Sequence, residues 1–215
     1  MSGAIPVCVF AKPPVAGQAK TRLGRGSLGD AGAARLARAF LQDVWATVSA
    51  LPWARPILAG SSDDRAAFGL PGEIELWPQG EGELGARMER VLARALAQAP
   101  QALLLGADLP GLPASHLDAA LAELAGAEVV LGPSEDGGFY LLGARRLLRG
   151  ALDGIGWSTA TTRAQTLARL VETGHSVRLG LPWFDVDEPE DLPRLRARLR
   201  ADPRSAPHTS AELAR

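Results

Sequence analysis

Cysteine is nearly absent from this chain of 215 residues, in which Cys8 is the single thiol. A disulfide bond within the chain is therefore excluded, and a metal site made of several thiolates is disfavoured. Cys8 lies inside an apolar run, where a free cysteine behaves as a small buried hydrophobic residue. We assign it no chemical role.

The chain also lacks long apolar runs and a strong charge of either sign. No uninterrupted apolar stretch reaches the roughly 20 residues of a membrane-spanning helix, and the first residues lack the basic-then-apolar layout of a signal peptide. The formal net charge is -1, so no general field attracts nucleic acid or an anionic membrane. We expect a cytoplasmic protein without such partners, in which a local cluster holds any anion. The sequence gives no oligomeric state.

The chain instead has the composition of an ordinary globular protein, and its apolar residues follow regular spacings. Hydrophobic residues make up 47% of the chain and charged residues 22%, which is typical of a folded domain. Short apolar runs alternate with segments of helical periodicity almost throughout. The runs predict strands at 5–11, 56–60, 73–77, 102–106, 128–132, 139–143 and 177–179, and the periodic segments predict helices at 30–50, 83–98, 113–124, 161–173 and 190–200.

This alternation predicts an α/β fold, a three-layer α/β/α sandwich around a mainly parallel sheet. The strand at 139–143 follows the preceding strand without a long crossover, so part of the sheet is expected to be antiparallel and the sheet mixed. No linker or repeat divides the chain, and residues 1–201 are expected to form a single domain. The polar, proline-containing residues 202–215 are expected to form a mobile tail.

A basic loop rich in glycine and proline, AKPPVAGQAKTRL (residues 11–23), follows the first predicted strand. Ligands of open α/β sheets bind beyond the carboxyl ends of strands, so the loop is a candidate site. Lys12, Lys20 and Arg22 supply positive charge, and Gly17 lets backbone N–H groups approach an anion. Lys12 and Lys20 are the only lysines of the chain, although the spacing is not that of a Walker A motif. The alternative is a solvated basic loop without a ligand.

Two acidic segments are expected at the same edge of the sheet. Asp108, in GADLPGLP, follows the strand at 102–106, and Asp187 lies in FDVDEPEDL after the last predicted strand. Carboxylates at strand ends are suited to holding Mg²⁺ or Mn²⁺, with phosphate oxygens completing the coordination. A structural alternative stays open for each, because Asp108 can cap a helix or turn and Asp187 precedes Pro189, which can begin a helix.

A tight turn, PSEDGGFYLLG (residues 133–143), adds a candidate acceptor surface. Asp136 can contact an acceptor or cap the turn, and Gly137 and Gly138 allow a ligand to approach the backbone closely. Trp157, followed by hydroxyl side chains, offers an aromatic face for the acceptor, or else anchors its loop as a half-buried side chain. None of the three histidines has a candidate partner, so none is assigned to catalysis.

Four motifs occur in a fixed order along the chain: FAKPPVAGQAKTRL (10–23), GADLPGLP (106–113), GPSEDGGFYLLG (132–143) and WFDVDEPEDL (183–192). Together they resemble the DUF2064 family of glycosyltransferases associated with radical-SAM or selenodomain proteins, within the nucleotide-diphospho-sugar transferase superfamily. The resemblance implies a GT-A type, Rossmann-like fold. Phospholactate guanylyltransferases and molybdenum-cofactor nucleotidylyltransferases are similar relatives with the same layout.

The resemblance implies a role for each matching residue. The first loop would hold the nucleotide phosphates, and Asp108 and Asp187 would hold Mg²⁺ or Mn²⁺, with Lys20 and Asp108 serving catalysis. The residues implied at the nucleotide are Ala11, Lys12, Gly17, Lys20, Thr21, Arg22, Leu109 and Pro110. The chain departs from the pattern at Glu188, where relatives often carry Thr, and in having Asp-Leu-Pro where many glycosyltransferases have Asp-x-Asp.

The leading hypothesis is a metal-dependent transferase with a nucleotide donor and a small-molecule acceptor. In a glycosyltransferase, which the family resemblance favours, a nucleoside diphosphate leaves and a sugar moves. In a nucleotidyltransferase, pyrophosphate leaves and a nucleoside monophosphate moves to a phosphorylated acceptor. The three basic residues of the first loop favour this version because they suit a long phosphate chain. A protein that binds a nucleotide without turnover is a third hypothesis.

Overall fold

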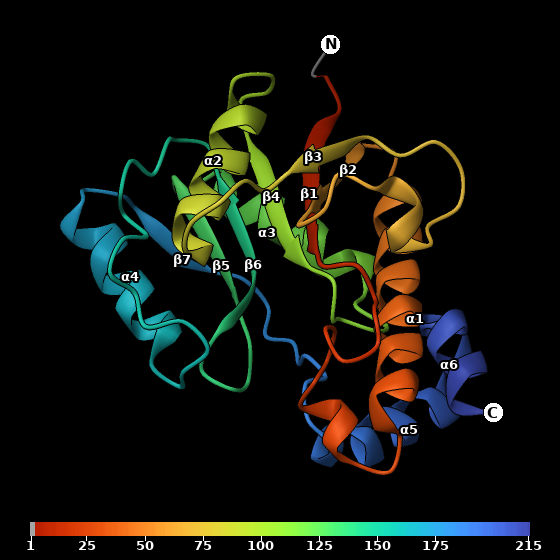
Figure 1. Cartoon of the computed structure of the whole chain (residues 1–215). Helices are drawn as coiled ribbons and strands as arrows, with labels where there is room; N and C mark the ends of the chain where they lie inside the picture. Colours follow the sequence, from red (N-terminus) through yellow and green to blue (C-terminus); the bar gives the residue numbers. More distant parts are fainter. Residues whose placement is uncertain (1–2) are drawn as a thin grey trace.

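The computed structural model describes residues 3–215, which fold around a seven-stranded sheet (Figure 1). The strands are β1 (Ile5–Ala11), β2 (Ala54–Gly60), β3 (Leu76–Pro78), β4 (Ala102–Gly106), β5 (Val129–Pro133), β6 (Phe139–Ala144) and β7 (Val177–Leu179). Their order in the sheet is β3-β2-β1-β4-β6-β5-β7. Neighbouring strands are parallel except that β6 runs antiparallel to both β4 and β5.

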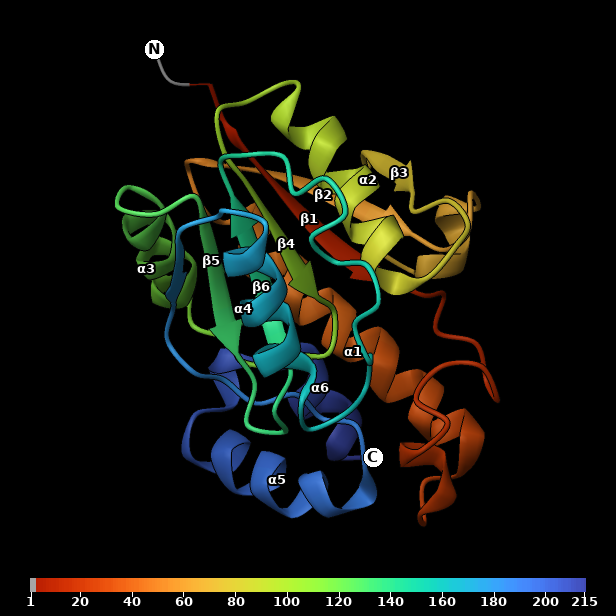
Figure 2. The same cartoon turned by 90° about the vertical axis from the view of Figure 1, so that its left-hand side faces the viewer.

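Helices cover both faces of the sheet (Figure 2). The α-helices within residues 3–215 are α1 (Gly29–Ser49), α2 (Leu84–Leu96), α3 (Ala114–Leu124), α4 (Thr162–Glu172), α5 (Leu192–Ala201) and α6 (Pro207–Leu213). Short 3₁₀ helices are η1 (Leu23–Arg25), η2 (Arg65–Phe68), η3 (Pro189–Asp191) and η4 (Pro203–Ser205). Helices α2 and α4 cover one face, and α1, α3 and α5 cover the other.

The two hydrophobic cores follow from the alternation of side chains along the strands. On β1, Val7 belongs to the core shared with α1 and α3, whereas Cys8 belongs to the core under α2 and α4. On β4, Leu103 belongs to the core shared with α1 and α3, and Leu104 belongs to the core under α2 and α4. Strands buried on both faces are apolar along their whole length, which is the pattern that the sequence shows. The prediction of a three-layer α/β/α fold is thereby confirmed.

The mixed character of the sheet is confirmed as well, since β6 is the expected antiparallel strand. The third strand differs from its prediction. The sequence predicts a strand at 73–77, but β3 covers only Leu76–Pro78, because this edge strand pairs with just the last residues of β2, Leu58 to Gly60.

The C-terminal residues differ from the predicted mobile tail. They form η4 and α6, and α6 packs on α1 through Asp43, a buried residue of α1. The Asp43 carboxylate accepts hydrogen bonds from the backbone N–H groups of His208 and Thr209, both at 2.9 Å, and from Thr209 Oγ1 at 2.6 Å. The first N–H groups of a helix have no partner within it, so Asp43 caps α6 from another helix. The prediction missed this because the partners lie 165 residues apart.

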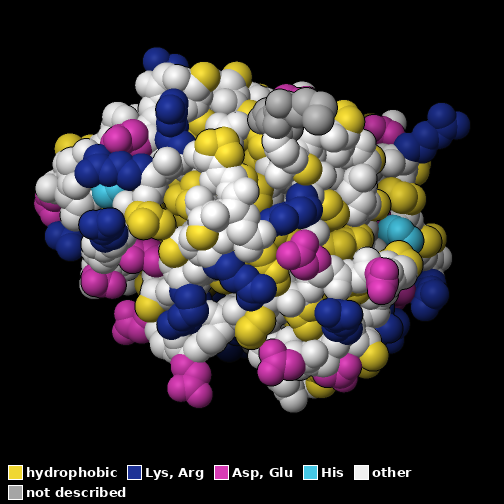
Figure 3. All heavy atoms as spheres, turned by 90° about the horizontal axis from the view of Figure 1, so that it is seen from above, with side chains coloured by type: hydrophobic (Ala, Val, Ile, Leu, Met, Phe, Trp, Pro, Cys, Tyr) yellow, Lys and Arg dark blue, Asp and Glu magenta, His cyan; other side chains and the backbone are white. Residues whose placement is uncertain are grey.

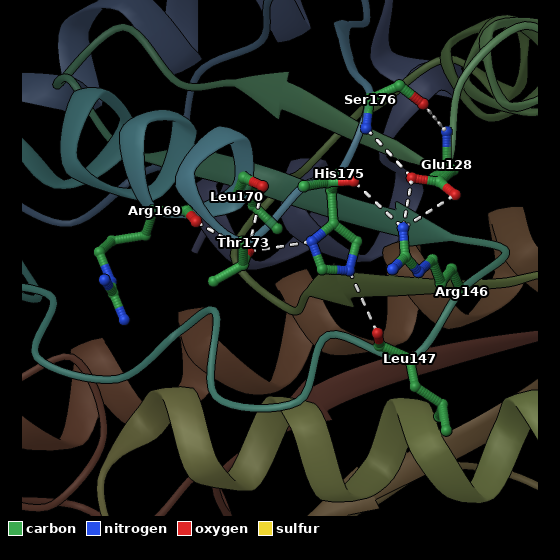
Figure 4. Close-up of polar contacts among 9 residues, drawn as sticks. Glu128, Arg146, Leu147, Arg169, Leu170, Thr173, His175 and Ser176 are labelled. Atoms are coloured by element: carbon green, nitrogen blue, oxygen red, sulfur yellow. Dashed lines mark hydrogen bonds and ion pairs between the residues drawn. The ribbon is translucent and has the colours of Figure 1, made fainter.

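A polar cluster of Glu128, Arg146, His175 and Ser176 closes the amino-terminal edge of β5 and β7 (Figure 4). We refer to it as the amino-edge cluster. The two Glu128 oxygens lie 3.1 and 3.2 Å from Arg146 Nη1, and one accepts the Ser176 N–H at 3.2 Å. The His175 ring is buried, and its Nε2 lies 3.2 Å from the Leu147 carbonyl oxygen. Side chains thus join the ends of three segments at this edge.

The face seen from the amino-terminal end of β1 carries basic and acidic side chains interspersed with hydrophobic ones (Figure 3). Within residues 3–215, none of the helices has both the length and the apolar character needed to cross a bilayer.

Candidate active site

An open cavity of about 930 Å³ lies at the carboxyl-terminal ends of β1 and β4. Phe10 and Ala11 line it from the end of β1, and Leu105 and Gly106 line it from the end of β4. Open α/β sheets bind their ligands at this edge, in the crevice between loops that leave the strands. The cavity therefore lies where the sequence places the candidate site.

The basic loop between β1 and α1 forms one wall of the cavity. Lys12, Lys20, Thr21 and Arg22 line it together with Ala11. Lys20 has a φ of 50°, in the left-handed region that residues other than glycine rarely adopt. Such strained conformations persist only where the surrounding structure enforces them, and they cluster at functional sites.

Asp108 and Asp187 reach the same cavity from loops far apart in the sequence. Asp108 follows β4 almost directly, and the segment before Asp187 is tied to the end of β5 by the parallel bridge between Ser134 and Trp183. The Val186 N–H donates a hydrogen bond of 3.3 Å to the Asp108 carbonyl. The two acidic loops are thus joined through their backbones, which brings the two carboxylates together.

Lys20 lies between these carboxylates. Its Nζ is 2.8 Å from Asp108 Oδ2 and also donates a hydrogen bond to Asp187 Oδ1. The lysine side chain is 6% exposed, whereas those of Asp108 and Asp187 are 42% and 45% exposed. Burial by itself would lower the pKa of Lys20, but the two carboxylates outweigh it and raise that pKa above its usual value. A buried ammonium ion therefore sits beside two carboxylates that remain accessible from the cavity.

Asp191 fixes the loop that carries Asp187. Its Oδ2 accepts hydrogen bonds from the backbone N–H groups of Asp187 and Glu188, each at 2.8 Å. Asp191 belongs to η3, so this is a capping interaction at the start of that short helix. Part of the acidity of FDVDEPEDL is therefore structural, while the Asp187 carboxylate takes no part in the cap and points to Lys20.

The oxygen donors suit a hard divalent cation. Mg²⁺ and Mn²⁺ prefer oxygen ligands, and Mg²⁺ is commonly held by one or two carboxylates together with substrate phosphates. Asp108 and Asp187 supply two half-exposed carboxylates. In the described part of the chain, there is no group of three or more His, Cys, Asp and Glu side chains that could hold a metal ion. The residues present therefore fit a cation that arrives with phosphate oxygens, and they do not form a complete site without them.

Two loops, at residues 134–138 and 156–161, form another wall, which we call the turn-loop wall. Arg163 N donates a hydrogen bond of 2.9 Å to the Gly137 carbonyl, which ties the turn to the start of α4. Gly137 has a φ of 91°, and a Cβ at this position would lie 2.1 Å from the Ala160 carbonyl oxygen. The glycine therefore allows the two loops to pack together. From this unit, Asp136, Gly138 and Trp157 line the cavity.

Aromatic and apolar side chains cover the end of the cavity next to α2. The rings of Phe139 and Trp157 pack edge to face, with their centroids 6.2 Å apart and their planes at 71°. Trp157 also packs on Gly85 of α2, where a Cβ would lie 3.0 Å from the indole ring. Trp157 Nε1 is buried without a hydrogen-bond partner among the described residues. Trp157 therefore anchors its loop and also lines the cavity, while its role toward an acceptor stays a prediction.

Asp185 and Ser158 also line the cavity, although the sequence predicted no individual role for either residue. Burial, followed by the charges of Asp187 and Asp136, raises the pKa of Asp185 to about 6. The Asp-x-Asp spacing was an available signal for Asp185, because alternate residues of an extended segment share a side and Val186 between them is buried. Ser158 has a φ of 59°, which nothing in the sequence signals.

Four predicted residues do not line the cavity. Leu109 and Pro110 are buried, and Leu109 belongs to the hydrophobic core. Gly17 has a φ of 74°, and a Cβ there would meet the Asp30 carboxylate at 3.5 Å. Gly137 serves the contact between the loops described above. These positions shape the loops whose other residues reach the cavity.

Residues 30–159, more than half of the chain, match the family DUF2064, which is described as an uncharacterized protein conserved in bacteria. The matched region contains Asp108 and most of the turn-loop wall, while the basic loop and Asp187 lie outside it. The comparison with curated proteins found no match.

Several solved structures share the fold. A protein of Desulfovibrio desulfuricans G20, provisionally named a nucleotide-diphospho-sugar transferase, is 29% identical with a TM-score of 0.87, and the match covers 100% of this chain and 95% of that one. CMP:2-keto-3-deoxy-manno-octonic acid synthetase complexed with CTP is 13% identical with a TM-score of 0.60, covering 94% and 100%. Rv0371c of Mycobacterium tuberculosis H37Rv in complex with manganese is 22% identical with a TM-score of 0.51, covering 91% and 98%.

These neighbours confirm the predicted nucleotide-diphospho-sugar transferase fold. The Desulfovibrio neighbour, at 29% identity over the full chain, also supports the prediction that the chain is a nucleotide-dependent transferase. At 13% and 22% identity, the latter two carry information about the fold alone.

Proposed function

The chain belongs to the DUF2064 family, and from this premise we propose that it is a metal-dependent glycosyltransferase that takes a sugar from a nucleotide-diphospho-sugar. The observation that carries the proposal is the convergence of a basic loop and two distant aspartates on one cavity. The provisional name of the Desulfovibrio neighbour points the same way.

Under this proposal the basic loop binds the donor phosphates. Lys12, Lys20 and Arg22 place positive charge around a diphosphate, and this charge stabilises the negative charge that develops on the leaving nucleoside diphosphate. A Mg²⁺ or Mn²⁺ ion held by Asp108 and Asp187 would add to that stabilisation as a Lewis acid. The low exposure of Lys20 keeps its charge away from bulk water, where an electrostatic contribution would be weaker.

The turn-loop wall receives the acceptor in this scheme. Asp136 Oδ1 accepts the Gly138 N–H at 2.8 Å, so the carboxylate is oriented and its other oxygen is available to a hydroxyl group. Trp157 supplies an aromatic face against which a sugar ring or an apolar group can pack. The wall therefore offers both a hydrogen-bond acceptor and an apolar surface to a small hydroxylated molecule.

Nucleotidyl transfer is the second candidate, and one observation favours it. Three cationic side chains at one wall suit a triphosphate better than a diphosphate. The neighbour complexed with CTP has the same fold. In this version pyrophosphate leaves and a nucleoside monophosphate moves to a phosphorylated acceptor.

The products distinguish the two reactions. The protein would be incubated with Mg²⁺ or Mn²⁺ and with each nucleotide sugar and each nucleoside triphosphate in turn, after a thermal-shift screen for ligands. A ligand at 100 times its dissociation constant stabilises a protein by about 2.7 kcal/mol, which is easily detected. We expect release of a nucleoside diphosphate from a nucleotide sugar. Release of pyrophosphate from a triphosphate would show that the reaction is nucleotidyl transfer and would refute glycosyl transfer. Stabilisation without any turnover would indicate a non-catalytic nucleotide-binding protein.

A further inference from the structure

The position of Lys20 bears on how a divalent cation can enter the site. Its ammonium group contacts Asp108 Oδ2 and Asp187 Oδ1, the same two carboxylates that fit a metal ion. We propose that Lys20 acts as a resident cation that keeps free divalent metal out of this site, so that the metal binds only together with the donor phosphates. This inference rests on the proposed function, because it concerns the substrate form that the cavity accepts.

Charge and distance make the two cations competitors. Lys20 Nζ occupies one oxygen of each carboxylate, and the lysine side chain is 6% exposed, so water screens its charge poorly. A divalent ion bound to both carboxylates would compete with that ammonium for the same groups and would be repelled by it. Among the described residues, no third acidic or histidine ligand is grouped with Asp108 and Asp187 to offset the repulsion.

Phosphate oxygens change this balance in two ways. They offer the ammonium group an anionic partner within the same cavity, since Lys12, Lys20 and Arg22 all line it. They also supply the oxygen ligands that two carboxylates lack, as Mg²⁺ sites with one or two carboxylates require. The flexible four-carbon stem of Lys20 would allow its ammonium group to turn from the carboxylates toward a phosphate.

Manganese binding without nucleotide tests the proposal directly. Free Mn²⁺ would be followed by electron paramagnetic resonance during titration of the whole protein with Mn²⁺ alone. We expect weak binding to the unaltered protein and binding tighter by at least roughly tenfold in Lys20→Met, because this variant removes the repulsion by the ammonium group; tenfold corresponds to about 1.4 kcal/mol. Lys20→Arg keeps the positive charge and should bind Mn²⁺ no better than the unaltered protein.

Lys12→Met is the matched control. It removes the other lysine, which lines the same cavity, and neither Asp108 nor Asp187 is paired with it. Its affinity for Mn²⁺ alone should match that of the unaltered protein. The double variant Lys20→Met, Asp108→Asn should lose the gain, which would locate the bound ion. Lys20→Gln, which retains hydrogen bonding, repeats the measurement if Lys20→Met does not fold as judged by circular dichroism.

Two failures can be told apart. If Lys20→Met and Lys20→Gln both fold and bind Mn²⁺ no better than the unaltered protein, the competition is refuted, while turnover of a nucleotide sugar can still stand. If the gain appears and depends on Asp108 but no nucleotide donor is turned over or bound, the proposed transferase is wrong and the exclusion of metal by Lys20 remains.

Discussion

Each of the two edges of the sheet carries a polar cluster, and the clusters differ in how their polar groups are paired. At the amino edge, Glu128 is bonded by Arg146 and by the backbone N–H of Ser176, and all these partners belong to the protein (Figure 4). At the carboxyl edge, Asp108 and Asp187 share the single ammonium of Lys20 and are nearly half exposed to a large cavity.

This difference teaches how to distinguish structural from functional charge clusters. A cluster whose donors and acceptors are matched within the protein stabilises the fold. A cluster that leaves carboxylate oxygens facing a cavity has capacity for a ligand, and the strained backbone of Lys20 adds to the contrast. The contrast predicts that substitutions at the amino edge affect stability and that substitutions at the carboxyl edge affect turnover.

The largest expected effect is on turnover in Asp108→Asn. Loss of the charge removes half of the candidate metal site, and we expect kcat/KM to fall by at least about a hundredfold, or roughly 2.7 kcal/mol. Lys20 keeps Asp187 as a partner, so the Tm should change by less than about 4 °C. Steady-state kinetics and a thermal melt measure the two quantities. A variant that melts far below the unaltered protein but turns over normally would reverse the assignment of the two edges.

The next largest effect is expected on the stability of a variant at Asp43, a buried carboxylate whose hydrogen-bond partners all belong to the protein. Asp43 is 3% exposed and accepts three hydrogen bonds from the start of α6. Asp43→Ala leaves those donors without an acceptor, and we expect the free energy of unfolding to fall by about 2 kcal/mol. Urea denaturation measures the loss, and nucleotide affinity should be unchanged. Equal stability would mean that α6 contributes little to the fold.

The smallest expected effect is a pH-dependent change in Glu128→Gln. The backbone N–H of Ser176 and then Arg146 lower the pKa of Glu128 from its usual 4.5. A carboxylate with a lowered pKa stabilises the folded state above its unfolded pKa, and this contribution disappears as the pH falls through the folded value. The Tm of the variant should therefore lie below that of the unaltered protein at pH 7, and the gap should narrow as the pH falls below the usual pKa of 4.5. A gap that does not depend on pH would show that the charge is not involved.

Much of the fold could be predicted because its determinants are local. The continuous apolar runs at 5–11 and 102–106 are the signature of strands buried on both faces, and the structure places them side by side. The carboxyl ends of parallel strands meet at one edge, so the basic loop and Asp108 could be expected in one cavity from the order of elements alone.

The remaining features depend on contacts between distant residues. The docking of α6 requires Asp43, which in the sequence is one acidic residue in the middle of a helix. The requirement for Gly137 comes from Ala160 of the neighbouring loop, which residue composition does not reveal. Lys20 lies between two carboxylates from loops that are distant in the sequence and has a φ of 50°, and the residues around it in the sequence reveal neither feature.

The confinement of both lysines to the basic loop has a practical consequence. The only thiol, Cys8, is fully buried and has a pKa raised to about 12 by burial, so thiol-directed probes have no ready target in the folded protein. Amine-directed probes have two side-chain targets, of which Lys12 is exposed and Lys20 is buried. A fluorophore or nucleotide dialdehyde coupled to the ε-amine of Lys12 would therefore report from the mouth of the cavity, and occupancy by a donor would be visible as protection of Lys12 in a peptide map of the labelled protein.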